Sequence, residues 1–227
     1  MEYVRLGTTG LKVSRIALGC MSYGDPTSTG AHTWALDDEA AQPFFRQAVE
    51  LGVTFWDTAN VYQHGTSEEL VGRAITRYSR REEKPFVAMQ DQYNLLRRQD
   101  ERELLPMCAD MGVGTVLYSP QSKGRLARPW GEQSHRSSGD AVVKAFDSPL
   151  DEPVVDAVQR IAEARGTSMA QVALAWVLKH PVVSAPIVGA TKPHHLPDSI
   201  AALDLHLTDD EIHALEEPYT PHGPSWY

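Results

Sequence analysis

Residues 55–69 decide the fold, and they read Phe55-Trp56-Asp57-Thr58-Ala59-Asn60-Val61-Tyr62-Gln63-His64-Gly65-Thr66-Ser67-Glu68-Glu69. An apolar run ends on the carboxylate of Asp57, and Tyr62 follows five residues later in a predicted loop. A helix is expected to begin at Thr66, because Thr66 and Glu69 have the spacing of a capping box. Polar groups that follow a buried strand are typical of an α/β barrel, whose catalytic residues lie at the carboxyl ends of its strands. We therefore treat Asp57 and Tyr62 as candidate catalytic residues.

The rest of the chain alternates predicted strands and helices, which is the order of a parallel α/β fold. Residues 3–13 predict a small β-hairpin. Apolar runs predict five core strands at residues 14–19, 53–56, 85–89, 113–118 and 181–188. Helices are predicted between these runs, for example after the capping boxes Ser168–Gln171 and Thr208–Glu211. Residues 119–150 predict a long loop, and loops of that length are usually functional.

Composition narrows the classes of function. The chain has 227 residues, 42% of them hydrophobic and 22% charged, as expected for one soluble globular domain. Its net charge of −9 argues against nucleic-acid binding, which needs a basic surface. Because no apolar run approaches the ~18 residues of a membrane span and the first residues lack a signal peptide's apolar core, we expect a cytoplasmic protein that does not bind membranes.

The cysteines and histidines predict neither a disulfide nor a metal site. Cys20 and Cys108 lie in apolar segments and are expected to be buried, free thiols. The histidines have no carboxylate or thiol at the spacing of metal ligands.

Nearly the whole chain resembles the aldo-keto reductases. Residues 55–69 are similar to the signature of that family. Residues 3–14 (Tyr-Val-Arg-Leu-Gly-Thr-Thr-Gly-Leu-Lys-Val-Ser) resemble its opening hairpin, and residues 18–24 (Leu-Gly-Cys-Met-Ser-Tyr-Gly) its first strand and loop. Residues 89–95, 118–124 and 187–193 resemble the sixth, seventh and eighth strands with their exits. Within the family, the chain resembles bacterial, NADP-linked members that reduce sugar-like carbonyls.

The resemblance implies a carbonyl reduction in which NADPH gives a hydride and a tyrosine protonates the oxygen. A free tyrosine titrates near pH ~10, so it is a poor acid unless a nearby cation lowers its pKa. In the family a lysine supplies this cation, an aspartate holds the lysine, and a histidine orients the substrate. The resemblance assigns the proton donor to Tyr62 and the lysine's partner to Asp57.

The resemblance also implies an NADP site. Gln90 would hydrogen-bond the nicotinamide amide and Tyr118 would stack on its ring. Ser119, Gln121 and Lys123 would line the pyrophosphate. The adenosine phosphate would lie at a helix N-terminus, in contact with Thr191 and Lys192.

Three positions depart from the family pattern. Gln63 replaces a usual glycine, and Gln121-Ser122 replaces an apolar residue followed by alanine. His194-His195 lies where the family often has an arginine for the 2′-phosphate, which leaves the choice between NADP and NAD open.

The resemblance is interrupted near Glu82-Glu83-Lys84. Residues 75–83 resemble the end of the second helix, and residues 85–89 already resemble the sixth strand. About three strand–helix units, which carry the lysine and the histidine in the family, have no counterpart. We expect a deletion with its junction near residues 82–85 inside one domain, 1–227. Lys84, Lys123 and Lys192 are alternative cations, with Lys84 at the wrong end of its strand, and His64 is interpreted as a solvated loop residue.

The expected fold is therefore a truncated (β/α)8 barrel with about five core parallel strands and an N-terminal β-hairpin. The missing strands would leave two sheet edges, so we expect an open or distorted sheet or a homodimer that pairs those edges. The expected function is NADPH-dependent reduction of an aldehyde or ketone, with activity weakened by the loss of the lysine and histidine. The alternative is a degenerate or recruited nucleotide-binding or interaction protein.

Overall fold

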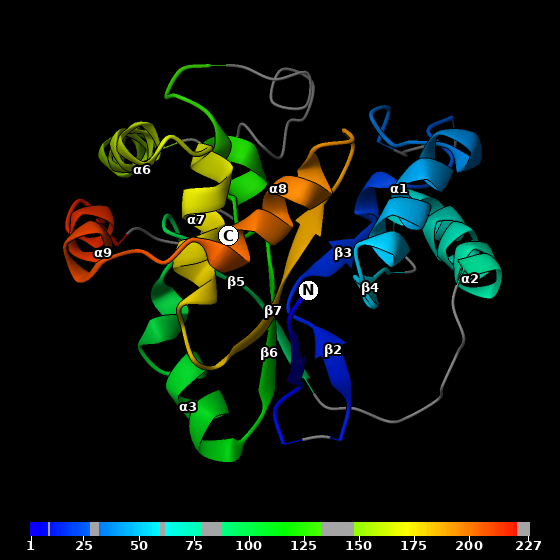
Figure 1. The fold of residues 1–227 in the computed structure, drawn as a ribbon, viewed down its shortest axis with the longest axis horizontal. Coiled ribbons are helices and arrows are strands. Elements are labelled where there is room, and N and C mark those ends of the chain that lie inside the picture. Colours follow the sequence, from blue (N-terminus) through cyan, green and yellow to red (C-terminus); the bar gives the residue numbers. More distant parts are fainter. Residues whose placement is uncertain (9, 28–31, 60–61, 79–87, 133–147, 222–227) are drawn as a thin grey trace.

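The computed structural model describes residues 1–227 except 9, 28–31, 60–61, 79–87, 133–147 and 222–227 (Figure 1). The described residues form a five-stranded parallel sheet and a separate two-stranded hairpin. The hairpin pairs β1 (Tyr3–Arg5) with β2 (Lys12–Ser14) in antiparallel register, as the sequence predicted. The five-stranded sheet contains β3 (Ala17–Gly19), β4 (Phe55–Asp57), β5 (Ala88–Gln92), β6 (Gly114–Tyr118) and β7 (Val183–Gly189).

The strand order is β4-β3-β7-β6-β5, and every neighbouring pair is parallel. β4 and β5 therefore form the two edges, and no backbone ladder joins them among the described residues. This confirms the predicted α/β fold with five core parallel strands and a hairpin.

The predicted bounds of β5 were wrong, because the strand extends to Gln92 rather than ending at Met89. Its backbone pairs with β6 over five residues, from Ala88↔Gly114 to Gln92↔Tyr118. An edge strand tolerates polar residues, so an apolar pattern could not mark its end. Residues 85–87 of the predicted strand, Lys84 and the predicted junction at 82–85 lie outside the described residues.

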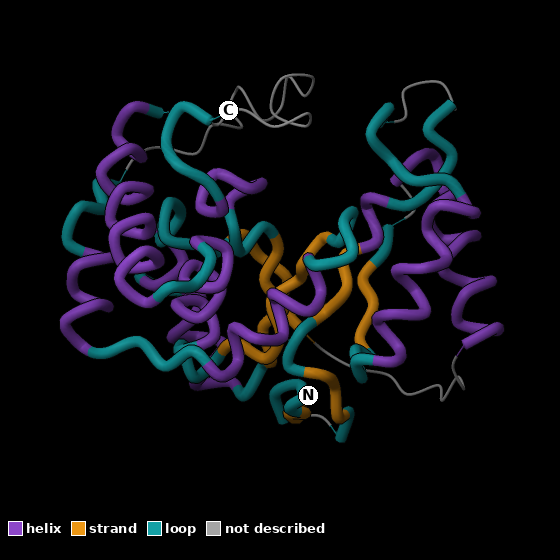
Figure 2. The backbone as a smooth tube through the Cα atoms, turned by 45° about the horizontal axis from the view of Figure 1, so that its top comes forward, coloured by secondary structure: helices purple, strands orange, loops and turns teal. Residues whose placement is uncertain are grey.

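Helices pack on both sides of the strands, as Figure 2 shows. The α-helices are α1 (Asp38–Glu50), α2 (Thr66–Tyr78), α3 (Leu104–Met111), α6 (Glu152–Arg165), α7 (Met169–Leu178), α8 (His195–Ala201) and α9 (Asp209–Glu216). The 3-10 turns are η1 (Cys20–Ser22), η2 (Tyr62–Gly65), η3 (Gln99–Glu101), η4 (Ser122–Ala127), η5 (Pro149–Asp151) and η6 (Ala202–Asp204).

Local signals explain where most helices begin and end. Both predicted capping boxes form, Ser168–Gln171 at α7 and Thr208–Glu211 at α9. Thr66 was predicted to form a capping box with Glu69, but its hydroxyl has other partners. It accepts the N–H of Asp25 and donates to the Gln63 carbonyl. These bonds tie the start of α2 to the loop after β3.

Three apolar clusters hold the elements together. One lies between β6, β7 and the helices α3, α6, α7 and α9, and it contains the fully buried Trp176. A second lies between β3, β4, β7 and the helices α1, α2 and α8. The third joins the hairpin to the inner face of the sheet through Leu6, Val13, Ala17, Val116, Ala185 and Ile187. The hairpin therefore covers the end of the sheet opposite to the carboxyl ends of the strands.

The hairpin can approach the sheet closely because glycines meet there. A Cβ on Gly114, the first residue of β6, would lie only 2.5 Å from the backbone nitrogen of Gly7. Gly7 itself has a φ of +57°, in the left-handed region that favours glycine.

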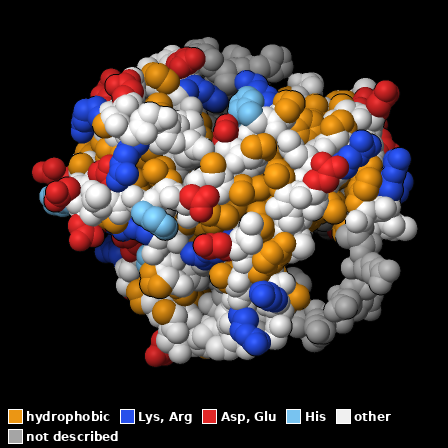
Figure 3. Space-filling view, viewed as in Figure 1, with side chains coloured by type: hydrophobic (Ala, Val, Ile, Leu, Met, Phe, Trp, Pro, Cys, Tyr) orange, Lys and Arg blue, Asp and Glu red, His pale blue; other side chains and the backbone are white. Residues whose placement is uncertain are grey.

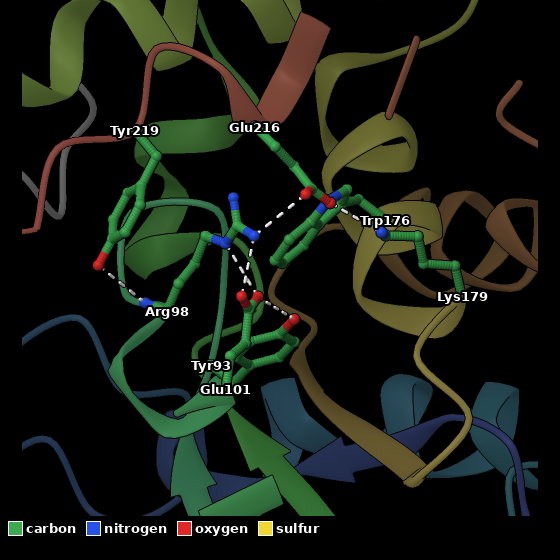
Figure 4. A network of polar contacts seen from close by, with 7 residues as sticks. All are labelled: Tyr93, Arg98, Glu101, Trp176, Lys179, Glu216 and Tyr219. Carbon is green, nitrogen blue, oxygen red and sulfur yellow. Dashed lines mark hydrogen bonds and ion pairs between the residues drawn. The ribbon is translucent and has the colours of Figure 1, made fainter. Parts of the chain in front are cut away.

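A polar network fastens α9 to the rest of the fold (Figure 4), and its members are Tyr93, Arg98, Glu101, Trp176, Lys179, Glu216 and Tyr219. The Arg98 guanidinium pairs with Glu101 at 2.8 Å and with Glu216 at 3.1 Å. The indole Nε1 of Trp176 donates to Glu216 at 2.8 Å. The network joins the exit of β5 to α7 and α9.

The surface shows mixed charge. On the face seen in Figure 3, Lys and Arg side chains are scattered among Asp and Glu rather than gathered into one basic patch. Cys20 and Cys108 are free and buried, as predicted. Within the described ranges, no helix has the length and apolarity required to cross a bilayer.

Candidate active site

Asp57, Tyr62 and Tyr118 come together at the carboxyl edge of the sheet. Asp57 is the last residue of β4 and lies in register with Gly19, the last residue of β3. Tyr118 is the last residue of β6, and Tyr62 begins the 3-10 turn η2. Asp57 and Tyr118 both influence the pKa of Tyr62, so the three side chains share one electrostatic environment.

The Asp57 carboxylate is held by an amide. Gln90 on β5 donates from Nε2 to Asp57 Oδ1 at 2.8 Å. Burial raises the pKa of the Asp57 carboxyl, and the hydrogen bond from Gln90 opposes part of that rise. Among the described residues, no lysine or arginine forms an ion pair with Asp57.

Tyr62 is a weak acid in this environment. Burial is the largest cause that raises the pKa of its phenol, and Asp57, Cys20 and Tyr118 raise that pKa further. Each of these effects disfavours the phenolate. At neutral pH Tyr62 therefore carries its proton, but it releases that proton reluctantly.

The backbone after Tyr62 explains why glycine would suit position 63. Gln63 and His64 have φ values of 44° and 54°, in the left-handed region. The Gln63 side chain is buried and donates to the Met21 carbonyl at 3.0 Å. This bond ties η2 to the turn after β3 and offsets part of the backbone cost of a non-glycine residue. His64 is exposed, as the sequence interpretation expected.

The loop after β6 contains several left-handed residues. Ser119, Ser122 and Lys123 have φ values of 52°, 48° and 56°. The Asn94 side chain donates to the Ser119 carbonyl at 2.9 Å and so anchors the start of the loop. Backbone that alternates between right- and left-handed conformations can turn its N–H groups toward one concavity, which suits an anion.

Gln121 lies in the same loop, and its side-chain amide bonds a different element of the fold. Its Nε2 donates to the Ala170 carbonyl at 3.3 Å, on the helix α7. The structure therefore places Gln121 as an anchor of the loop, and its predicted contact with the pyrophosphate stays a prediction.

Thr191 and Lys192 are exposed between β7 and α8. The backbone N–H of Thr191 donates to Nδ1 of His195 at 3.2 Å. Burial lowers the pKa of His195, and His194 and Lys192 lower it further. The backbone N–H of Thr191, at the predicted phosphate contact, is thus already hydrogen-bonded within the protein.

Sequence reasoning missed three features of the site. It did not foresee the Gln90–Asp57 bond, nor the nearness of Cys20, whose thiol pKa is raised by burial and by Asp57. It also missed that burial, and then Asp91, raise the pKa of Asp100 to about 6 beside Tyr118. An acidic residue, Asp91, directly after the predicted strand 85–89 was the available signal for the Asp91–Asp100 pair.

Known proteins are similar to this chain over most of its length. A versiconal hemiacetal acetate reductase of Aspergillus parasiticus is 31% identical over 339 aligned positions, which span 97% of this chain and 98% of that protein. An aldo-keto reductase of Metarhizium robertsii is 27% identical over 97% of this chain and 92% of its own length. Both relatives are fungal, whereas the sequence pattern resembled bacterial members. The first alignment sets 339 positions against 227 residues, so at least 112 positions have no residue of this chain.

The fold also has a solved counterpart. The crystal structure of a thermostable aldo-keto reductase in complex with the inhibitor epalrestat aligns with a TM-score of 0.71 over 96% of this chain and 100% of the other, at 20% identity. The Aldo/keto reductase family model matches residues 15–89 and 77–219. These matches cover most of the chain and include both Asp57 and Tyr62, and the chain therefore belongs to the aldo/keto reductase family of oxidoreductases.

Proposed function

We propose that this protein reduces a small aldehyde or ketone with NADPH, and that Tyr62 donates the proton. The observation that carries this proposal is the meeting of Asp57, Tyr62 and Tyr118 at the carboxyl edge of the sheet. When bound, NADPH supplies the hydride for the carbonyl carbon and becomes NADP⁺. The Tyr62 hydroxyl supplies the proton for the carbonyl oxygen, and the phenolate is then reprotonated from water.

The residues present fit the nucleotide. Tyr118 offers a half-buried aromatic face, and the left-handed backbone at Ser119 and Lys123 suits a pyrophosphate. We propose the following residues as its binding set: Gln90, Tyr118, Ser119, Gln121, Lys123, Thr191 and Lys192. Because Nε2 of Gln90 donates to Asp57, we propose that its Oε1 accepts from the nicotinamide amide. His194 and His195 follow the proposed phosphate contacts Thr191 and Lys192, so we propose NADP as the cofactor and NAD as the alternative.

The reaction is expected to be slow. The family's lysine and histidine belong to units that we propose are absent, within a single domain whose junction is near residues 82–85. The family model supports this, because its two matched segments overlap at residues 77–89. The alignment with the Aspergillus protein also supports the absence of these units, because many of its positions have no residue of this chain. Without the lysine, Tyr62 must act as an acid beside an uncompensated carboxylate.

The substrate class follows from the family. We propose a small carbonyl compound, with sugar-like carbonyls as the first panel because the sequence resembles members that reduce them. The cytoplasmic location also stays a prediction.

One experiment separates this function from its alternative. Quenching of nicotinamide fluorescence measures NADPH binding, and a panel of small aldehydes then measures turnover. We expect binding with slow turnover, and Tyr62→Phe is expected to reduce turnover by about 10²-fold or more without changing NADPH affinity. Binding without turnover would favour a degenerate nucleotide-binding protein, and absence of binding would favour a recruited scaffold.

We further propose a homodimer at the exposed sheet edge. β5 is an edge strand, and Met89 on β5 and Met107 and Met111 on α3 are exposed large hydrophobic side chains. An unpaired edge next to exposed apolar side chains is a common site of pairing between chains.

A further inference from the structure

Asp57 and Gln90 face each other across the two open edges of the sheet. Their strands, β4 and β5, stand first and last in the strand order. Nevertheless Gln90 Nε2 lies 2.8 Å from Asp57 Oδ1. This contact between side chains connects two edges that no described backbone ladder joins.

The hydrogen-bond partner of Asp57, the Gln90 amide, is neutral. An amide satisfies one lone pair of a carboxylate but leaves its negative charge in place. That charge acts on Tyr62, since Asp57 is the first of the charged neighbours that disfavour its phenolate. A cation at the position of the Gln90 amide would instead favour the ionised form of both groups.

We propose that Gln90 is a positioning residue whose amide holds Asp57 across the open edge, so that Gln90→Lys sets a cation against the carboxylate that disfavours the Tyr62 phenolate. The inference rests on the proposed function only in taking Tyr62 as the proton donor. The geometry favours the substitution for two reasons. The lysine stem is one atom longer than that of glutamine and flexible, and Gln90 is exposed, so the ammonium can reach Asp57 without full desolvation.

The direct test is the ionisation of Tyr62 without cofactor or substrate. Phenolate absorbance is recorded between about pH 8 and about pH 12, and the signal of Tyr62 is the difference between each protein and its Tyr62→Phe counterpart. Gln90→Lys is expected to lower the pKa of Tyr62 by about one unit or more. Gln90→Glu is expected to raise that pKa, because it sets a second carboxylate against Asp57.

Gln159→Lys is the matched control. Gln159 Nε2 also donates to a carboxylate, Glu163 Oε1 at 2.8 Å, but on the exposed face of α6. The control adds the same charge and is expected to leave the pKa of Tyr62 unchanged. The inference is overturned if the Lys and Glu variants at position 90 titrate Tyr62 like the control. If the Lys variant does not fold, as judged by circular dichroism, the Glu variant decides the question by its opposite sign.

Measurements of turnover test whether a change in the pKa of Tyr62 alters catalysis. Because Gln90→Lys also removes a proposed nicotinamide contact, turnover is measured at saturating NADPH. There, with a small aldehyde, the variant is expected to raise kcat about tenfold with little change in the KM for the aldehyde, because a better acid acts on the transition state. A shift in the pKa of Tyr62 without any turnover would refute the proposed reductase function but support the role of Gln90. Turnover without that shift would refute the role of Gln90 and leave the reductase function standing.

Discussion

The backbone N–H of Thr191 donates a hydrogen bond to the imidazole Nδ1 of His195, and the two nitrogens are 3.2 Å apart. Thr191 follows β7, and His195 is the first residue of α8. Only a neutral imidazole can accept this bond. The pKa of His195 is lowered by burial and by its neighbours His194 and Lys192, so the bond persists at neutral pH.

We predict that His195→Ala tightens NADPH binding, because it frees the Thr191 N–H for a phosphate oxygen. One hydrogen bond is worth about 1 kcal/mol, which corresponds to an increase in affinity of about fivefold. For the same reason, the wild-type protein is expected to bind NADPH more tightly as the pH falls through the lowered pKa of His195, where the imidazole becomes cationic. Fluorescence titrations at two pH values test both statements, with the exposed His206→Ala as control. Weaker binding by the His195 variant would show that the imidazole itself holds the nucleotide.

Asp57→Asn is predicted to stabilise the protein at neutral pH. The pKa of Asp57 is raised in the folded state, so its ionisation costs folding free energy above that pKa, and the cost disappears as the pH falls through it. Asparagine keeps an oxygen that can accept from Gln90. We expect the melting temperature of the Asn variant to exceed that of the wild type at pH 7, and the difference to disappear as the pH falls through the raised pKa of Asp57.

Asp38→Asn provides the contrast for this measurement. Asp38 lies in the first turn of α1 and pairs with Arg73 at 3.1 Å on the surface. Removing a carboxylate near a helix N-terminus is expected to lower stability slightly at pH 7. If both variants lose stability at pH 7, the desolvated charge of Asp57 does not destabilise the folded state.

Arg98→Met is predicted to destabilise the protein by about 2–3 kcal/mol. The Arg98 side chain is 14% exposed and compensates two partly buried carboxylates, Glu101 and Glu216. Removing it leaves Glu101 without this cation, while Glu216 keeps Lys179 at 2.7 Å, and partial solvent exposure reduces the cost from the range for fully buried pairs. Urea unfolding measures the change. Arg73→Met, at an ion pair whose side chains are 55% and 52% exposed, is expected to cost less than about 0.5 kcal/mol, and equal losses would argue against the network in Figure 4.

The two directions of the proposed reaction are predicted to differ in their pH dependence. Reduction needs protonated Tyr62, whereas oxidation of the alcohol needs its phenolate. Because the pKa of Tyr62 is raised above its ordinary value, reduction should persist through neutral pH, and oxidation should still be increasing with pH at about pH 10 rather than levelling off below it. Profiles of kcat against pH in both directions test this. An oxidation rate that is already constant near pH ~8 would mean that a cation does reach Tyr62.

Met111→Glu is predicted to weaken the proposed homodimer. Met111 is 65% exposed on α3, so a charge there costs the monomer little. Sedimentation across a range of concentrations should show the dimer shifting toward monomer by at least about tenfold in dissociation constant. Leu150, also exposed at 48% but on η5, is the control position as Leu150→Glu. A wild-type protein that stays monomeric at all concentrations would refute the dimer.

The sequence by itself determined the local structure. Capping boxes at Ser168 and Thr208 and the left-handed stop at Gly112 are local, since their partners lie within a few residues of one another. The order of strands and helices and the family resemblance around Asp57 and Tyr62 were likewise readable from short segments. These features do not depend on how distant parts of the chain meet.

The tertiary structure alone decided which partners the site residues take. Gln90 is 33 residues from Asp57 in sequence, and its amide reaches that carboxylate because β4 and β5 are brought together at the two ends of a five-strand order. The end of β5 at Gln92 was set in the same way, by backbone pairing with β6. A polar side chain bonds a partner that the fold brings within reach, and residue types alone do not specify that partner.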